Sequence, residues 1–416
     1  MKILWLSHLV PYPAAGRGVL QRSYHLVREL ARTHEVHLLA FVQRKLILDL
    51  LGDADAGLAQ AKRHLEGYCA RVQFLSIPSE ARRWGTARLA ASSLLGAYPY
   101  TVRWLRAKEA EALVSKWSES INFDVVHFDT ISLAPYRHYF SRSALTLDHH
   151  NIESHMMLRR ARKEGNPFKK MYFWQEGVRL EQYERRVCPQ FALNITCSDL
   201  DSHRLRMVAP GVSVVEVPNG VDTTYFSPEG GSENPGGLVF AGAMSRYANA
   251  SAMLFFAEKI WPELKRLRPE VTIDVVGGNP PERLRALAAR DKNFRVHGFV
   301  PDVRPFIRRA AVYVCPITDG GGTKLKILDA LAMGKAIVAH PVACEGISVS
   351  PGLNVIFARN AHEFSMEIAT LLDDAQLRAR LSFAARSLVE KSYSYSVIGK
   401  MLTGAFERFA NYNRRF

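Results

Sequence analysis

The chain has 416 residues, of which 48% are hydrophobic, and a formal net charge of +15. This length favours two domains, and the composition excludes a disordered or collagen-like chain. The five cysteines are scattered and form no C-x-x-C pair, so we expect reduced core thiols rather than a zinc or disulfide framework.

The amino-terminal half alternates short apolar runs with amphipathic segments. The first run is followed by a Pro- and Gly-containing loop and a helix expected over residues 19–32. Such alternation is typical of a parallel sheet covered by helices. We therefore predict one doubly wound domain up to residue 225. Its strands are expected at residues 2–10, 35–42, 71–78, 123–129, 144–150, 192–198 and 212–218.

Residues 218–237 are rich in Pro and Gly and predict a linker, after which a second alternation begins. We expect a second Rossmann-like domain over residues 226–396 and a final helix, 397–416, that completes the first domain. Strands are expected at residues 237–243, 271–278, 294–300, 312–318 and 335–341, and helices at 250–268, 282–290, 303–311 and 324–333. The apolar run at the amino terminus is short for a signal peptide, so a cytoplasmic location is expected.

The segment DGGGTKLKILD at residues 319–329 lies where a strand is expected to end and a helix to begin. Successive glycines let the backbone approach a ligand, and the start of a helix attracts an anion. A diphosphate would suit this position, with charge from Lys324 and Lys326, and Asp329 could accept hydrogen bonds from ribose hydroxyls. The alternative is a flexible turn followed by a solvated basic helix.

With the AlaLeuAlaMetGlyLys that follows it, this segment resembles the donor-binding signature of glycosyltransferase family 4. Further matches in family order extend the resemblance over about residues 215–395. They are PNGVD at 218–222, FAGAMS at 240–245, VGG at 276–278, HGFV at 297–300 and ACEG at 343–346. The resemblance implies the GT-B fold, an α/β architecture in which two Rossmann-like doubly wound domains face each other across a cleft. It also implies metal-independent transfer with retention of configuration, with no cofactor.

The resemblance assigns a donor site to particular residues of this chain. The expected donor-binding residues are Gly16, Arg17, Gly18, Ser245, Gly277, Val300, Gly320, Gly321, Gly322, Thr323, Lys326 and Asp329. The family's usual pair of acids falls on Gly321 and Asp329, so the first acid is absent and the second is shortened.

Charge that develops on the leaving β-phosphate needs a cation or preorganised amides. Arg246 and Lys324 are the candidates, the alternative for Arg246 being a surface arginine on a loop. Family members often have an arginine and a lysine after the first strand of the second domain, where this chain has Ala243 and Asn249.

In the first domain, DHHNIE at residues 148–153 follows a strand, at the sheet edge where ligands bind. We expect one of the two histidines, His149 or His150, to face the ligand, and we take His150 as a catalytic candidate. Adjacent residues of an extended segment point to opposite faces and no third ligand is evident at useful spacing, so no metal site is expected. Two Asp-x-Asp segments, at 53–55 and 199–201, are interpreted as structural.

Basic residues without acids gather between residues 81 and 108, together with Trp84 and Trp104. The cations are Arg82, Arg83, Arg88, Arg103, Arg106 and Lys108. This mixture suits an anionic membrane surface where a lipid-linked acceptor would be delivered, or else an ordinary solvated basic face. A second basic stretch spans residues 159–170. No nucleic-acid-binding motif is present, so nucleic acid is not an expected partner.

We therefore predict a retaining glycosyltransferase that moves a sugar from a nucleotide-diphospho-sugar to a saccharide or lipid-linked acceptor, in cell-surface polysaccharide or glycolipid biosynthesis. A nucleotide-sugar epimerase of the same fold is one alternative, but the region of the family's acid pair, residues 321–329, does not favour it. A noncatalytic sugar-nucleotide-binding protein is another, and Gly321 in place of an acid is consistent with it.

Overall fold

The computed structural model describes residues 1–14, 18–80, 83–230 and 232–413. The chain divides into two compact units: unit 1 is Met1–Pro218 with the segment from Ile398 onward, and unit 2 is Asn219–Val397. The predicted limits stood at residues 225 and 396. Among the described residues, no helix has both the length and the apolar character needed to cross a membrane.

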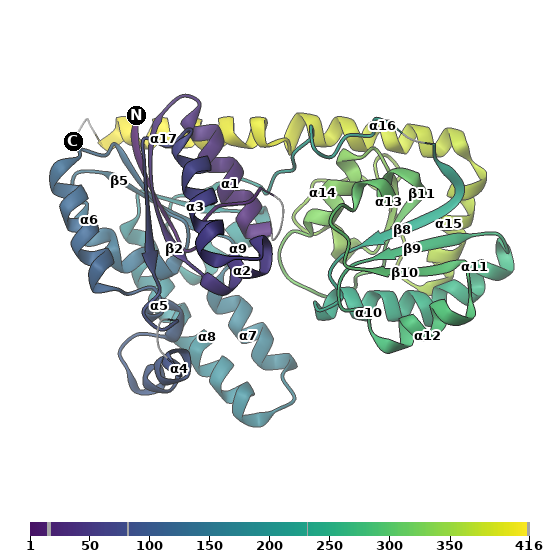
Figure 1. The fold of residues 1–416 in the computed structure, drawn as a ribbon, viewed down its shortest axis with the longest axis horizontal. Helices are drawn as coiled ribbons and strands as arrows, with labels where there is room; N and C mark the ends of the chain where they lie inside the picture. The colour runs from purple at the N-terminus through teal and green to yellow at the C-terminus, as the bar shows by residue number, and fades with distance from the viewer. Residues whose placement is uncertain (15–17, 81–82, 231, 414–416) are drawn as a thin grey trace. The chain divides into compact units, whose positions relative to one another are not determined.

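Unit 1 contains a seven-stranded parallel sheet in the order β3-β2-β1-β4-β5-β6-β7 (Figure 1). Each of the seven strands expected for this half is present. They are β1 (Lys2–Ser7), β2 (Glu35–Val42), β3 (Arg71–Ser76), β4 (Val125–Phe128), β5 (Ala144–His149), β6 (Leu193–Thr196) and β7 (Val214–Glu216).

Helices cover both faces of this sheet. Those before β4 are α1 (Gly18–Ala31), α2 (Arg44–Leu51), α3 (Ala54–Glu66), α4 (Gly85–Leu95), α5 (Tyr100–Arg103) and α6 (Lys108–Ser120). After β4 come η1 (Ile131–Tyr139), α7 (Glu153–Lys163), α8 (Pro167–Val187), η2 (Cys188–Gln190), α9 (Asp199–Val208) and, at the end of the chain, α17 (Tyr395–Asn413).

The alternation of side chains along β1 explains why both faces need cover. Ile3 and Trp5 point into a core that includes Phe406 of α17, whereas Leu4 and Leu6 point into a core that includes Trp117 of α6. All four of these β1 side chains are fully buried. Burial of each contributes about 2 kcal/mol, so a near-continuous apolar strand is stable only between two helical layers.

Unit 2 repeats the plan with a six-stranded parallel sheet in the order β10-β9-β8-β11-β12-β13. The predicted doubly wound α/β architecture is thus confirmed in both units. The strands are β8 (Asn234–Ala241), β9 (Thr272–Val276), β10 (Phe294–Gly298), β11 (Ala310–Cys315), β12 (Ala336–Ala339) and β13 (Ile356–Phe357).

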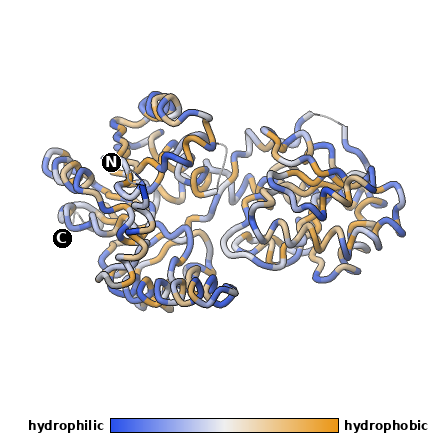
Figure 2. Tube along the Cα trace, turned by 60° about the horizontal axis from the view of Figure 1, so that its bottom comes forward, coloured by the Kyte–Doolittle hydropathy of each residue, from blue (hydrophilic) through white to orange (hydrophobic). Residues whose placement is uncertain are grey.

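The helices of unit 2 include every one expected from the sequence. They are α10 (Tyr247–Phe255), the π-helical turn η3 (Phe256–Ile260), α11 (Trp261–Leu267), α12 (Glu282–Arg290), α13 (Arg304–Arg309), α14 (Leu325–Ala332), η4 (Pro341–Cys344), α15 (Ala361–Asp373) and α16 (Ala375–Ser392). Figure 2 shows hydrophobic segments of the trace running through the inside of the unit. The five cysteines are free and buried, as predicted.

Candidate functional site

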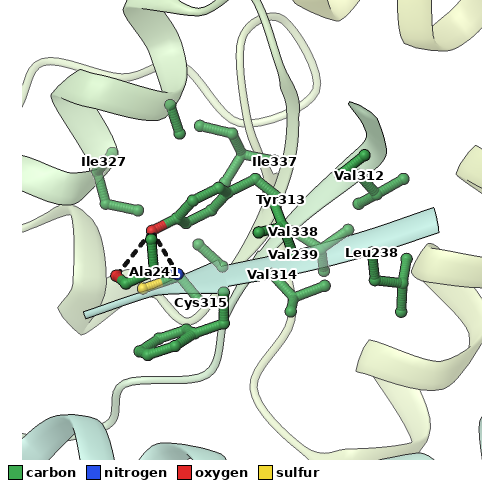
Figure 3. Close-up of a cluster of buried hydrophobic side chains, with 14 of the residues drawn as sticks. Leu238, Val239, Ala241, Val312, Tyr313, Val314, Cys315, Ile327, Ile337 and Val338 are labelled. Atoms are coloured by element: carbon green, nitrogen blue, oxygen red, sulfur yellow. Dashed lines mark hydrogen bonds between the residues drawn. The ribbon is translucent and has the colours of Figure 1, made fainter. Parts of the chain in front are cut away.

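In unit 2 the order of strands reverses between β8 and β11, and open parallel sheets bind ligands beyond the carboxyl ends of strands at such a point. The two strand ends are joined by Tyr313 of β11. Its hydroxyl donates to the carbonyl oxygen of Ala241 at 3.2 Å and accepts from the Ala241 amide at 3.4 Å (Figure 3). These two hydrogen bonds hold β8 and β11 together at the carboxyl edge of the sheet, where the predicted donor loop begins.

The loop between β11 and α14 carries the predicted glycines. Gly320 and Gly322 have backbone φ values of 123° and 71°, in a region that residues other than glycine rarely adopt. The first turn of α14 has no side-chain cap; the Ile327 amide donates to the Lys324 carbonyl oxygen, and no side chain caps the amides before it. The buried hydroxyl of Thr323 also has no hydrogen-bond partner among the described residues. Unsatisfied donors beside a helix amino terminus suit an anionic ligand.

Lys326 of α14 reaches back to the end of β8. Its Nζ atom donates to Oδ1 of Asn249 at 2.5 Å and lies 4.6 Å from the centre of the Phe240 ring. A Cβ atom on Gly242 would lie 2.2 Å from this Nζ, so only glycine leaves room for the ammonium group. Lys326 thereby occupies the point where the strand order reverses.

Lys324, the other predicted cation, is held on the loop itself. Its Nζ atom donates to the carbonyl oxygen of Gly320 at 2.8 Å and lies 3.7 Å from Oε2 of Glu345. Glu345 follows η4, and the sequence analysis assigned it no role. Gly321 stands where the family's first acid is expected, and Glu345 is a carboxylate that the structure brings close to Lys324.

Asp329 lies on the same face of α14 as Lys326, three residues later. Burial raises the pKa of the Asp329 carboxyl to about 7, an effect that the charge of Lys326 only partly offsets. Burial also lowers the pKa of Lys326 to about 8. A ligand with hydroxyls and phosphates would complement two such desolvated groups.

The remaining predicted residues of unit 2 surround this edge. Ser245 and Arg246 are exposed between β8 and α10. Gly277 has a φ of 155°, and a Cβ atom there would lie 2.0 Å from the carbonyl oxygen of Gly242, so glycine is required. Val300 is partly buried against the core of the unit, just after β10.

In unit 1 the strand order reverses between β1 and β4, and a buried carboxylate lies there. The Oδ1 atom of Asp129 accepts from Nε2 of His150 at 2.7 Å. Its Oδ2 atom accepts from the hydroxyls of Ser7 at 2.7 Å and Ser23 at 3.1 Å and from Nδ1 of His8 at 3.2 Å. Asp129 is fully buried, so four donors compensate for its desolvation.

This network sets the charge of His150. Although burial alone would lower the pKa of its imidazole, the adjacent Asp129 carboxylate raises that pKa well above the usual value. The two histidines hold the pKa of Asp129 well below its usual range despite its burial. The stable state is therefore an imidazolium beside a carboxylate. The His150 side chain keeps 9% of its surface exposed, which is enough to present one edge to a ligand.

The neighbours of His150 have structural roles. The His149 ring is buried and hydrogen bonds to Oδ1 of Asn194 at 3.0 Å, and burial lowers its pKa. Asp148 forms a buried ion pair with Arg22 of α1, which also donates to the carbonyl oxygen of Val217. Of the two adjacent histidines, His150 is thus the one available to a ligand.

Two predicted donor residues of unit 1, Gly16 and Arg17, lie outside the described residues. Gly18 is the first residue of α1. Asp53 caps α3 by accepting from the amide of Ala56 at 2.8 Å, and the Asp201 amide donates to the Ser198 cap of α9. The structural interpretation of the two Asp-x-Asp segments is therefore confirmed.

A possible metal-ligand group was missed in the sequence. Ligand atoms of His8, Asp129 and His150 all lie within 4.8 Å of one another, so a third ligand does come together with the histidine and the acid. Its signal was the position of His8 directly after the first strand. Both oxygens of Asp129 already accept hydrogen bonds, which favours a closed hydrogen-bonded network over ion coordination.

Comparison with known proteins gives a family match in unit 2. Residues 235–374 match the family Glycosyl transferases group 1. The chain is 27% identical over 241 residues to the phosphatidyl-myo-inositol mannosyltransferase of Mycolicibacterium smegmatis, a match that spans 56% of this chain and 60% of that relative. It is 21% identical over 408 residues to an uncharacterized 44.6 kDa protein in the cps region of Klebsiella pneumoniae, covering 94% and 96% of the two chains.

Solved structures resemble the whole chain. Anabaena HepE in complex with UDP matches with a TM-score of 0.62 and 15% identity, covering 98% of this chain and 100% of that chain. The same protein in complex with UDP-glucose gives the same values. At this level of identity the likeness shows a common fold.

Proposed function

We propose, from the match of residues 235–374 to the glycosyl transferases of group 1, that the chain transfers a hexose from a nucleotide-diphospho-sugar to a saccharide or lipid-linked acceptor. The observation that carries the proposal is the convergence of a glycine loop, an uncapped helix start and two lysines at the carboxyl edge of the unit 2 sheet. Such an arrangement is suited to a diphosphate.

The donor diphosphate is bound without a metal ion in this proposal. Family members often have a lysine near position 249, where this chain has asparagine. Here Lys326 brings its ammonium group to the Asn249 side chain, 2.5 Å from Oδ1, and so supplies a cation to the same position. Together with Lys324 and the amides of α14 it meets the charge that develops on the β-phosphate as the glycosidic bond breaks.

The sugar is transferred with retention of configuration, as the resemblance to family 4 implies. The leaving phosphate deprotonates the acceptor hydroxyl, so no side chain need form a covalent intermediate. Asp329 accepts hydrogen bonds from the ribose, and because burial raises the pKa of its carboxyl to about 7, such donors would compensate for its desolvation. In unit 1, His150 contacts the acceptor in this proposal, and Asp129 fixes the orientation and charge of its imidazolium.

The names of the relatives support this donor and acceptor chemistry. HepE is in complex with UDP and with UDP-glucose, which supports a nucleotide-sugar donor. The mycobacterial relative is named for mannosyl transfer to phosphatidyl-myo-inositol, which supports a lipid-linked acceptor. We accordingly propose that the protein works on the cytoplasmic face of a membrane as a peripheral protein, in polysaccharide or glycolipid assembly.

The proposal is tested by supplying purified protein with labelled UDP-, GDP- and ADP-sugars and with lipid extracts or soluble saccharides as acceptors. Label that moves to an acceptor only when donor and acceptor are both present supports transfer, and nuclear magnetic resonance of the product gives its anomeric configuration. Conversion of the donor to an epimer with no acceptor product would instead indicate an epimerase.

A further inference from the structure

Helices α7 and α8 form a hairpin whose end carries exposed apolar side chains. Phe168 is 82% exposed, Met171 is 64% exposed and Trp174 is 56% exposed, and all three lie in the first turns of α8. In Figure 1 the hairpin extends beyond the strands of unit 1, and its turn lies far from the sheet. Exposure of three large apolar side chains to water is unfavourable in free energy, and an apolar partner that covered them would remove this cost.

The hairpin is a well-packed element. Asn166 caps α8 by accepting from the amides of Phe168 and Lys169 at 3.0 and 3.1 Å. A Cβ atom on Gly177 would lie 2.8 Å from the Leu158 side chain, so glycine lets the two helices approach closely. The Arg160 guanidinium lies 4.0 Å from the centre of the Phe173 ring. The exposed side chains are therefore presented on a formed helix.

The same end of the hairpin is strongly basic. Between Ser154 and Gln175 the sequence has six cations and one acid, Glu164. The cations are Arg159, Arg160, Arg162, Lys163, Lys169 and Lys170. All but Arg159, which is half-buried, belong to exposed residues. Positive charge thus surrounds the apolar groups.

Helix α4 adds to this surface. Gln175 and Arg179 of α8 donate to the carbonyl oxygens of Leu94 and Ser93, at 2.9 and 2.5 Å, so the end of α4 is bound to the hairpin. On the α4 segment Trp84 is 68% exposed and Leu94 is 40% exposed.

The rest of the basic stretch at residues 81–108 is mixed in exposure: Trp104 is partly buried, whereas Arg106 and Lys108 are exposed. Trp104 donates to Oγ of Ser132 at 3.0 Å, and Arg106 pairs with Glu111 at 3.5 Å. Arg83 and Arg88 are exposed, and Arg82 lies outside the described residues. The apolar and basic groups that are exposed together are thus those of the hairpin end, while Trp84, Arg83 and Arg88 are exposed on the α4 segment.

We propose that the end of the α7–α8 hairpin docks on the anionic surface of a lipid bilayer, with Phe168, Met171 and Trp174 inserted among the headgroups. A bilayer fits both features, because it offers an apolar layer beneath a layer of negative charge. Aromatic side chains with amphipathic rings favour that boundary. The inference names the element responsible for the membrane association proposed above, on which it rests.

The test is sedimentation of the purified chain with phosphatidylcholine vesicles that contain or lack phosphatidylglycerol. Wild type should bind the anionic vesicles and be released as salt rises, because salt screens the attraction. Phe168→Ser with Met171→Ser and Trp174→Ser should abolish binding. Lys169→Gln with Lys170→Gln should lower the partition coefficient about tenfold, since each cation near an anionic surface contributes severalfold.

Matched controls carry the same substitutions elsewhere. Phe383→Ser with Met207→Ser removes two exposed apolar groups, and Lys391→Gln with Lys400→Gln removes two exposed cations. Both controls should bind vesicles as wild type does. Nucleotide affinity and thermal unfolding of every variant are measured in parallel, so that loss of the donor site or of the fold is seen separately from loss of docking.

Two outcomes overturn the proposal. One is equal vesicle binding by wild type and by both hairpin variants, which would assign docking to another surface or to none. The other is concentration-dependent dimerisation in sedimentation velocity that the apolar substitutions abolish, which would make the hairpin end a contact between two copies of the chain.

Discussion

The Nε2 atom of His150 lies 2.7 Å from Oδ1 of Asp129, and these residues follow the ends of β5 and β4 in unit 1. The carboxylate is fully buried, so it exerts its charge on the imidazole with little screening by water. This pair raises the pKa of His150 well above its usual value and so favours the imidazolium form at neutral pH. Asp129 is therefore a positioning residue for the group that we assign to the reaction.

Asp129→Asn should lower the pKa of His150, because burial is then opposed by Asp148 and Cys197 without the larger effect of the Asp129 carboxylate. We expect turnover at neutral pH to fall about ten- to a hundredfold, the loss of one charge-assisted interaction, while KM for the donor changes little. The pH–rate profile should shift to lower pH. The surface variant His138→Gln serves as the control, and an unshifted profile in Asp129→Asn would remove Asp129 from this role.

The same pair predicts how stability depends on pH. The pKa of His150 is raised on folding, so its stabilisation is complete below its ordinary value of 6.5 and is lost as pH rises through the higher folded value. The pKa of Asp129 is lowered, so its stabilisation is present above 3.8 and is lost as pH falls through the lower folded value. The melting temperature of wild type should exceed that of Asp129→Asn most between pH 3.8 and 6.5. An equal difference at all pH values would contradict the assigned charges.

Lys326 predicts a pH limit on donor binding. Its pKa is lowered to about 8, and a bound diphosphate would raise it, so binding must take up a proton when the free protein is above that pH. Affinity for a nucleoside diphosphate should therefore decline above pH 8 in wild type. Calorimetry in buffers of different ionisation enthalpy measures the proton uptake. Lys326→Met should bind more weakly and show no such uptake, and uptake that persists in this variant would exclude Lys326.

Asp329→Ala should weaken nucleotide binding by about 1–3 kcal/mol, the cost of losing an acceptor for the ribose hydroxyls. The fold should survive, because a desolvated carboxylate is not needed for stability. Titration of the variant beside Glu270→Ala, an exposed acid of unit 2, measures the effect. Unchanged affinity would remove Asp329 from the site.

Donor binding should persist in excess EDTA, because lysines and backbone amides neutralise the diphosphate in the proposed site. Calorimetry with and without the chelator decides this. If affinity were lost in EDTA and restored by magnesium or manganese, the metal-free mechanism would be wrong.

Much of the fold could be predicted because a parallel strand that is buried on both faces has a nearly continuous run of apolar residues in the sequence. KILWLS and AAVYVC are almost wholly buried in β1 and β11, and the segments between such runs are amphipathic helices. The donor loop could also be predicted from the sequence, because successive glycines between a strand and a helix indicate a backbone conformation that other residues rarely adopt.

The residues that contact the predicted site side chains could not be predicted from the sequence in the same way. Asp129 and His8 are 121 residues apart, and Asn249 and Lys326 are 77 residues apart. Each pair meets only because the strand order reverses between two particular strands, and periodicity does not give strand order. The basic character of residues 159–170 was visible in the sequence, whereas the exposure of Phe168 and Trp174 depends on how α7 packs on α8.

Sugar transfer is tested by measuring release of nucleoside diphosphate from a nucleotide-sugar, in EDTA, before and after an acceptor fraction is added. We predict that release rises when acceptor is added and that Lys326→Met lowers the acceptor-dependent rate. If the protein bound the nucleotide tightly but released none with any donor and acceptor fraction, it would be a noncatalytic sugar-nucleotide-binding protein rather than a glycosyltransferase.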